Sequence, residues 1–165
     1  MPVTDHCDSI RAPAQLSPVV IRAFQLEDFE NAYRLDQSCY PPGIAYSRFE
    51  LAEFLSLAGA AAWVGEEEGT LGGFIIVRRA GRRRGHVVTL DVREDRRRCG
   101  LGSRLLAAAE EWLRQQGVRR VWLETAVTNH GAVAFWEHAG FHTTALLSRY
   151  YLGREDAYRM EKELG

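Results

Sequence analysis

One stretch of the sequence, residues 87–106, constrains the fold more than any other part of the chain. An apolar run at 87–92 is followed by arginines, by Gly100-Leu101-Gly102 and by leucines at helical spacing. This order predicts a strand that enters a helix through a glycine turn. Amide N–H groups in such a turn, and the positive end of the helix dipole, favour a phosphate group. The stretch therefore predicts an α/β fold with an anion site where the strand ends. A strand–helix turn without a ligand is the alternative.

Two nucleotide-binding motifs do not fit this turn. The dinucleotide fingerprint needs a third glycine three residues after the second, and Leu105 stands there. A Walker A loop needs Gly-Lys followed by Ser or Thr, but Gly102 is followed by Ser103 and Arg104. Both nucleotide interpretations are therefore disfavoured.

Hydrophobic periodicity and turn residues predict one element order along the whole chain. Strands are predicted at 19–23, 61–66, 71–79, 86–92, 118–127, 141–147 and 157–163. Helices are predicted at 26–37, 47–58, 101–116 and 129–139. Ser47 and Glu50 have capping-box spacing, and Gly117 suits the position after a helix end. The order β-α-α-β-β-β-α-β-α-β-β predicts a mixed, mostly antiparallel twisted sheet flanked by helices, with a parallel pair across the long helix.

Length and charge limit the classes of function. The 165 residues suit one domain, for which we take 19–165, with 1–18 as a disordered lead-in. A net charge of −1 gives no global field for nucleic acid or an acidic membrane. No segment has the apolar length of a membrane span, and the first residues do not resemble a signal peptide. We therefore expect neither a nucleic-acid partner nor a membrane partner.

Cysteine and histidine spacing argues against metal and disulfide sites. Cys7, Cys39 and Cys99 are widely spaced, which suits a reducing cytoplasm better than a disulfide framework or a zinc site. The histidines at 86, 130, 138 and 142 show no metal-ligand spacing, so we expect surface or packed side chains. The arginines at 82–84 are expected at a solvated hairpin tip.

The stretch at 87–106 resembles the acyl-CoA motif of the GNAT family of N-acetyltransferases. That motif has a strand ending in Val, then Gln/Arg-x-x-Gly-x-Gly/Ala, then a helix with a leucine pair, here Leu105-Leu106. The resemblance implies acetyl-CoA as cofactor, with loop amides that hold its pyrophosphate and strand backbone that pairs with its pantetheine arm. The loop residues are Arg97, Arg98, Cys99, Gly100, Leu101, Gly102 and Ser103, and the strand residues are Leu90, Asp91 and Val92. Arg96 to Arg98 would neutralise phosphate charge. Cys99 occupies a variable slot and is taken as incidental.

Two further segments carry the resemblance. The run at 122–125 followed by Asn129, Ala132, Phe135-Trp136 and Gly140-Phe141 is similar to the family's second motif, which implies cofactor contacts for Asn129, Phe135 and Trp136. Asn129 also suits a helix N-cap.

The tail resembles the YY…EDA..M ending of the RimI-like branch of N-terminal protein acetyltransferases. In that branch the peptide groove would involve Tyr150 and Tyr151, with Pro41 and Tyr46 opposite. A protein or peptide N-terminus is the implied acceptor. A small-molecule amine or lysine acceptor, or a non-catalytic acyl-CoA-binding module, remains the alternative. The oligomeric state stays open.

Glu124 is the candidate catalytic base. An amine attacks a thioester only as the free base, and an α-amine has a pKa of about 7.7–8.0. Glu124 lies mid-strand on a face shared with Trp122 and Ala126, where burial is expected to raise its pKa toward working pH. The alternative is a structural carboxylate paired with a buried arginine or a backbone cap.

The source of a proton for the departing thiolate stays open at this stage. The family usually keeps a tyrosine where this chain has Trp136, and an indole N–H has no usable acidity. Tyr150 or Tyr151 can supply the proton instead. A thiolate with a pKa near 8.5 can also leave without help or with water. Slow or absent turnover is the third possibility.

Overall fold

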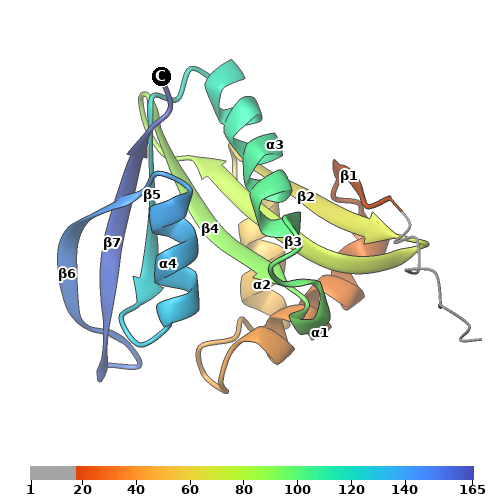
Figure 1. Ribbon diagram of the computed structural model, residues 1–165, viewed down its shortest axis with the longest axis horizontal. Helices are drawn as coiled ribbons and strands as arrows, with labels where there is room; N and C mark the ends of the chain where they lie inside the picture. Colours follow the sequence, from red (N-terminus) through yellow and green to blue (C-terminus); the bar gives the residue numbers. More distant parts are fainter. Residues whose placement is uncertain (1–17) are drawn as a thin grey trace, which may run out of the picture.

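The computed structural model describes residues 18–165, which form a seven-stranded sheet flanked by helices (Figure 1). The strands are β1 (Val20–Ala23), β2 (Ala60–Glu67), β3 (Thr70–Arg79), β4 (Arg84–Val92), β5 (Arg120–Ala126), β6 (His142–Tyr151) and β7 (Glu155–Glu163). The helices are α1 (Phe29–Cys39), α2 (Arg48–Ser56), α3 (Leu101–Gln115) and α4 (His130–His138), with 3-10 turns η1 (Leu26–Asp28) and η2 (Glu94–Arg96). The lead-in was predicted at 1–18, and its residues 1–17 lie outside the described residues.

The sheet has the strand order β1-β2-β3-β4-β5-β7-β6. All neighbours are antiparallel except β4 and β5, which are parallel and joined through α3. The predicted element order and the mixed sheet are therefore confirmed. The predicted first helix differs in one detail, because its first turn is the 3-10 turn η1.

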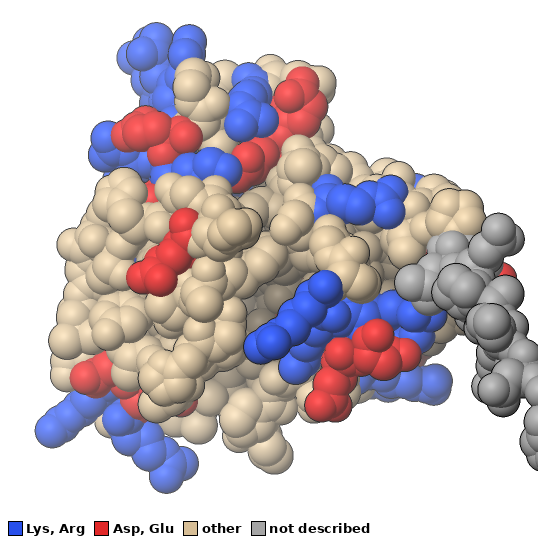
Figure 2. Space-filling view, viewed as in Figure 1, with Lys and Arg blue, Asp and Glu red and all other residues tan. Residues whose placement is uncertain are grey.

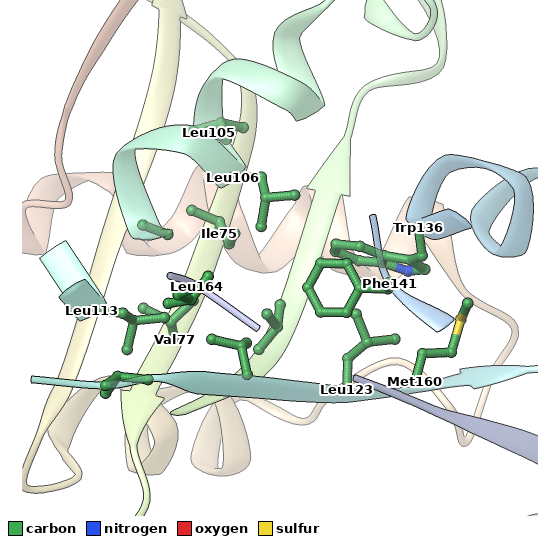
Figure 3. Packing of buried hydrophobic residues seen from close by; sticks show 14 of the residues in the cluster. Ile75, Val77, Leu105, Leu106, Leu113, Leu123, Trp136, Phe141, Met160 and Leu164 are labelled. Carbon is green, nitrogen blue, oxygen red and sulfur yellow. The ribbon is translucent and has the colours of Figure 1, made fainter. Parts of the chain in front are cut away.

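Each face of the sheet carries its own hydrophobic core. Under α3 and α4, Leu105, Leu113, Leu123 and Met160 are buried in one cluster (Figure 3). Under α1 and α2, a smaller cluster forms around Leu51, Val64, Phe74 and Ile76. Burying each leucine contributes roughly 1.5–3 kcal/mol, so the two clusters hold the helices on opposite faces.

Local signals explain where the helices begin and end. Ser47 accepts the Glu50 backbone N–H and the Glu50 side chain returns to Ser47, which is the predicted capping box of α2. Asn129 accepts the Ala132 N–H at 3.1 Å and so caps α4. Gly117 has a φ of +76° just after α3, where glycine costs least. Among the described residues, no helix is long and apolar enough to cross a membrane.

A β-bulge in β4 changes which of its side chains face α1. The pairing of β4 with β3 shifts between Ile76 and Val77, so Val88 is an extra residue on β4. Beyond it, Leu90 and Val92 pack toward the α3 cluster, whereas Thr89 and Asp91 lie buried with a side-chain hydrogen bond between them. Bulges change the direction of side chains along a strand. Polar side chains thus reach the α1 face of an otherwise apolar strand.

Candidate active site

The glycine turn connects β4 to α3 and has an open outer side. Gly100 is the N-cap of α3 with a φ of +84°, a left-handed conformation that costs other residues roughly 1–2 kcal/mol. A Cβ built on Gly100 would meet no described atom within 4 Å. Figure 2 shows basic side chains gathered over this turn, beside a hollow in the surface. The turn therefore fits a phosphate group approaching its amides.

The arginines of the turn are not equivalent. Arg96 forms an ion pair with Glu67 at 2.5 Å, so its guanidinium is engaged within the protein. Arg97 donates from Nε to the Val92 carbonyl at 3.0 Å. Arg98 is exposed and makes no hydrogen bond or ion pair with the described residues. Of the three arginines assigned to phosphate neutralisation, Arg98 is therefore the most available and Arg96 the least.

The other turn residues divide between surface and core. Cys99 is exposed, with its thiol donating to the Arg96 carbonyl at 2.7 Å, and Ser103 is exposed on the first turn of α3. Leu101 is 2% exposed, so its backbone and not its side chain is available to a ligand. A Cβ on Gly102 would lie 3.3 Å from the Phe135 ring, so this glycine permits close packing of α3 on α4.

The strands β4 and β5 diverge directly beside the turn. Their parallel pairing covers only Arg84, Gly85 and His86 on β4, and the last pair is His86 with Trp122. Past that point the β5-facing edge of β4, which includes the backbone of 90–92, has no strand partner among residues 18–165. The neighbouring strands therefore diverge at the carboxyl end of β4, next to the glycine turn, where the sequence predicts the ligand site.

Glu124 lies on β5 within a network of polar side chains at this divergence. Its Oε2 is 2.7 Å from His86 Nε2 on β4. Its Oε1 accepts from Arg159 on β7, at 3.0 Å from Nη2 and 3.3 Å from Nε. The Glu124 side chain is 8% exposed. Side chains from three strands thus meet at the nearly buried carboxylate of Glu124.

The pKa of Glu124 is lowered, and the predicted rise is wrong. Burial does raise the pKa of this carboxyl, but hydrogen bonds and charge interactions with His86 and Arg159 outweigh the burial. The sequence suggested a largely apolar face around Glu124. The strand register instead brings the side chains of His86 and Arg159 to this face. Glu124 is therefore ionised at neutral pH.

His86 is a residue that the sequence did not single out. Its ring stacks on Trp122 with centroids 4.9 Å apart, and its Nδ1 is buried without a hydrogen-bond partner among the described residues. If Nε2 carries the hydrogen toward Glu124, Nδ1 keeps a free lone pair. The signal that could have found His86 is the strand register, which a sequence pattern alone does not supply.

Tyrosines flank the divergence from both sides. The Tyr46 hydroxyl, from the loop after α1, donates to the Val88 carbonyl at 3.2 Å at the bulge of β4. The Tyr151 hydroxyl, from the β6–β7 hairpin, donates to the Glu124 carbonyl at 3.4 Å. Tyr150 and Tyr151 form a T-shaped pair with centroids 4.9 Å apart. Burial raises the pKa of all three phenols, so they stay protonated hydrogen-bond donors.

The loop after α1 meets the tip of the β6–β7 hairpin. A Cβ built on Gly43 would lie 3.3 Å from a methyl carbon of Leu152. The Pro41 carbonyl accepts the Ile44 and Ala45 N–H groups at 3.1 and 3.2 Å, which folds this loop into a compact turn. The structure therefore brings the predicted groove residues together where the loop meets the hairpin. Pro41 and Tyr46 lie on the loop, and Tyr150 and Tyr151 lie on the hairpin.

Trp136 lies in the core beneath the site. Its ring centroid is 4.9 Å from that of Phe135 and 5.3 Å from that of Phe141, and it is 7% exposed (Figure 3). This packing leaves little of Trp136 for the predicted cofactor contact. The tyrosines of the hairpin and the loop remain as hydroxyl hydrogen-bond donors at the site.

Comparison with known proteins agrees with this geometry. The sequence profile described as "Acetyltransferase (GNAT) family" matches residues 29–141. An N-alpha-acetyltransferase of Sulfolobus acidocaldarius is 30% identical over 156 residues, which cover 87% of this chain and 92% of the relative. The fold and the sequence together place the chain in one class of enzyme. It belongs to the GNAT family and is an acetyl-CoA-dependent N-acetyltransferase.

Solved structures give the same result. Ard1 from Thermoplasma volcanium has a TM-score of 0.80 and 28% identity, covering 88% of this chain and 97% of its own. The ribosomal-protein-S18-alanine N-acetyltransferase from Escherichia coli has a TM-score of 0.78 and 25% identity, covering 90% and 95%. The predicted GNAT fold and RimI-like branch are confirmed.

Proposed function

We propose that this enzyme transfers the acetyl group of acetyl-CoA to the N-terminal α-amine of a protein or peptide. The observation that carries the proposal is the Glu124–His86 pair, set where β4 and β5 diverge, between the glycine turn and the tyrosine-lined loops. The names of the relatives, an N-alpha-acetyltransferase and a ribosomal-protein alanine acetyltransferase, support the same acceptor.

The donor side is assigned to the turn and the free edge of β4. Backbone amides of 98–103 hold the pyrophosphate, since the Arg97 N–H already donates to the Glu94 carbonyl. Arg98 adds charge, and the backbone of Leu90 to Val92 lies along the pantetheine arm. The open side of Gly100 supports this assignment. Phe135 lies at the turn through its packing on Gly102, and Asn129, which caps α4, is assigned to the cofactor by the family resemblance. Acetyl-CoA supplies an activated thioester carbon, and the protein supplies orientation and proton transfer.

The Glu124–His86 pair is assigned the role of base. An α-ammonium loses its proton to the pair, and the freed nitrogen lone pair attacks the thioester carbon. The C–N bond forms and the C–S bond breaks; the nitrogen gives its second proton to water, and the thiolate takes up a proton from water. The two groups are 2.7 Å apart and share one hydrogen bond, so they act on the acceptor amine together.

The tyrosines are assigned to the departing thiolate. A phenol with a raised pKa is a weaker acid than a thiol with a pKa near 8.5. Tyr150 or Tyr151 therefore stabilises the thiolate by hydrogen bonding, and its final proton comes from water. This assignment explains how turnover proceeds with Trp136 in the usual tyrosine position.

The contact of Gly43 with Leu152 supports an acceptor that enters end first. An internal lysine would have to bring its flanking chain past this contact, whereas an N-terminus inserts without a preceding segment. The lower pKa of an α-amine, about 7.7–8.0 against 10.4 for lysine, also suits an ordinary base. We retain 19–165 as the catalytic domain. The free thiols Cys39 and Cys99 support a cytoplasmic location.

A peptide with one α-amine and one internal lysine tests the acceptor. Incubated with acetyl-CoA and analysed by fragment mass spectrometry, it is expected to carry acetyl on the α-amine only. The control peptide, with a formylated N-terminus, is expected to remain unmodified. Acetyl-lysine in both peptides would contradict the proposal and favour a lysine acetyltransferase.

A further inference from the structure

A second pair of buried carboxyl groups lies between α1 and β4, apart from Glu124. Asp36 is 0% exposed and Asp91 is 1% exposed. The two carboxyl groups are within hydrogen-bonding reach of each other. Neither forms an ion pair with any Lys, Arg or His among residues 18–165. Two adjacent charges without a counterion would be costly in this interior.

The hydrogen bonds of this pair leave one oxygen unsatisfied on each side. Asp36 Oδ2 accepts the Tyr46 backbone N–H at 2.7 Å, and Asp91 Oδ1 accepts the Thr89 hydroxyl at 2.9 Å. The other oxygens, Asp36 Oδ1 and Asp91 Oδ2, are buried without a partner in the described part of the chain. Ionised carboxylates only accept, but one protonated carboxyl donates to its neighbour. A single proton between these oxygens satisfies both.

The surroundings favour retention of that proton. Burial and the Asp36 charge raise the pKa of Asp91 to about 8, and burial also raises the pKa of Asp36. The other titratable groups that face the pair come from α1, the segment after it and α2: Cys39, Tyr40, Tyr46 and Glu50. None of them is basic, and the β3 residue paired with Asp91 is Phe74. At neutral pH the pair therefore holds one proton and one negative charge.

The pair is attached to the loop that carries Tyr46. Besides its N–H bond to Asp36, Tyr46 accepts the Gln37 side-chain amide at its carbonyl, at 2.7 Å. Its hydroxyl reaches the Val88 carbonyl on β4. Tyr46 is thus bound to β4 directly, and a second time through Asp36 and Asp91. Loss of the Asp36–Asp91 link would leave the hydroxyl bond to Val88 to hold Tyr46 on β4, beside its bond with Gln37 on α1 and its ring contact with Phe54 on α2.

We propose that Asp36 and Asp91 are positioning residues that share one proton and thereby fix Tyr46 and the 40–47 loop against the diverging end of β4. This role rests on the proposed function, because it takes that loop as one wall of the acceptor groove. Above the pH at which the shared proton is lost, the two carboxylates repel and the loop loosens. The expected consequence is weaker acceptor binding at alkaline pH.

Binding of an N-acetylated peptide to the enzyme saturated with desulfo-CoA tests this role. Neither probe carries the reacting group that would titrate near pH 8, since the peptide lacks an α-amine and the desulfo compound lacks a thiol. The peptide affinity of wild type is expected to be about tenfold lower well above pH 8 than below it. In free energy, this change is equivalent to a shift of one pKa unit. Asp91→Asn keeps a donor toward Asp36 without a titrating proton, so its affinity is expected to stay constant. Glu53→Gln, on the exposed face of α2, is the matched control and should follow wild type.

Carbon-13 NMR of the aspartate carboxyl groups measures the proton without any acceptor. Wild type is expected to show a carboxyl that titrates near pH 8 and disappears in Asp91→Asn, with Asp36→Asn as a second variant. If no carboxyl titrates there, the shared proton is refuted whatever the acceptor is. A peptide affinity that falls equally in wild type and Asp91→Asn refutes the positioning role. If the NMR titration shows the shared proton but neither wild type nor any variant binds the peptide, the acceptor assignment is overturned. The positioning role is then overturned as well.

Discussion

β4 and β5 contribute apolar side chains to the α3 face of the sheet and polar side chains to the α1 face. Val87 and Leu123 pack under α3, beside the turn that we assign to acetyl-CoA. His86, Glu124 and Asp91 lie on the opposite face, beside the acceptor loops. The same two strands thus support a packed donor side and a polar acceptor side, and single substitutions should affect one side without the other.

The donor side is expected to give the largest effect on binding. In Gly100→Val, a branched side chain at φ +84° strains the turn and fills its open side. The variant is expected to lose two charge-assisted hydrogen bonds between the turn and the pyrophosphate. This loss corresponds to roughly a hundredfold weaker acetyl-CoA binding, which calorimetry measures. Gly69→Val is the matched control, because Gly69 also has an open Cβ position and a φ of +76° in the β2–β3 turn. Equal losses in both variants would show that the effect is general strain.

The acceptor side is expected to give the largest effect on rate. Glu124→Gln removes the carboxylate that holds His86, so single-turnover transfer should fall about a hundredfold with acetyl-CoA affinity retained. The acidic limb of the pH–rate profile should then move to the titration of the acceptor α-amine, whose pKa is about 7.7–8.0. Glu163→Gln, an exposed partner of Arg120, is the control. An unchanged pH–rate profile in Glu124→Gln would place the base elsewhere.

The two faces also differ in how far the sequence predicted them. Local signals, such as Gly100, the Ser47 capping box and the leucine spacing of α3, were sufficient for the element order and the donor turn. The acceptor chemistry depends on register between strands distant in sequence. His86 reaches Glu124 through a short parallel pairing, and Arg159 reaches it from β7. Burial of Glu124 was foreseeable and pairing with an arginine was the alternative considered, but the identity of Arg159 and the second partner His86 depend on the register.

A smaller effect is expected at the hairpin tyrosines. Tyr151→Phe removes the hydroxyl beside Glu124 and should lower the single-turnover rate about tenfold, the equivalent of one hydrogen bond. Tyr150→Phe, in the neighbouring ring, shows which of the two serves the thiolate. Full rates in both variants would indicate that water alone is sufficient.

The smallest effect is a difference in stability against pH. The pKa of Asp91 is raised in the folded state, so its contribution to the free energy of unfolding declines from about pH 4 to about pH 8. The pKa of Glu124 is lowered, so its contribution is present above its ordinary value and is lost as pH falls through the folded value. In urea unfolding, wild type should therefore lose stability relative to Asp91→Asn as pH rises, and relative to Glu124→Gln as pH falls. Parallel curves would contradict the two assignments.

The separation of donor and acceptor sides is tested most directly by one paired measurement on Gly100→Val and Glu124→Gln. For each variant, the single-turnover rate of peptide acetylation is followed against acetyl-CoA concentration, which yields an apparent affinity and a limiting rate. The expected pattern is crossed: Gly100→Val weakens affinity and keeps the limiting rate, and Glu124→Gln keeps affinity and loses the rate. Loss of both quantities in both variants would contradict the assignment of binding to the turn and of proton transfer to the Glu124–His86 pair.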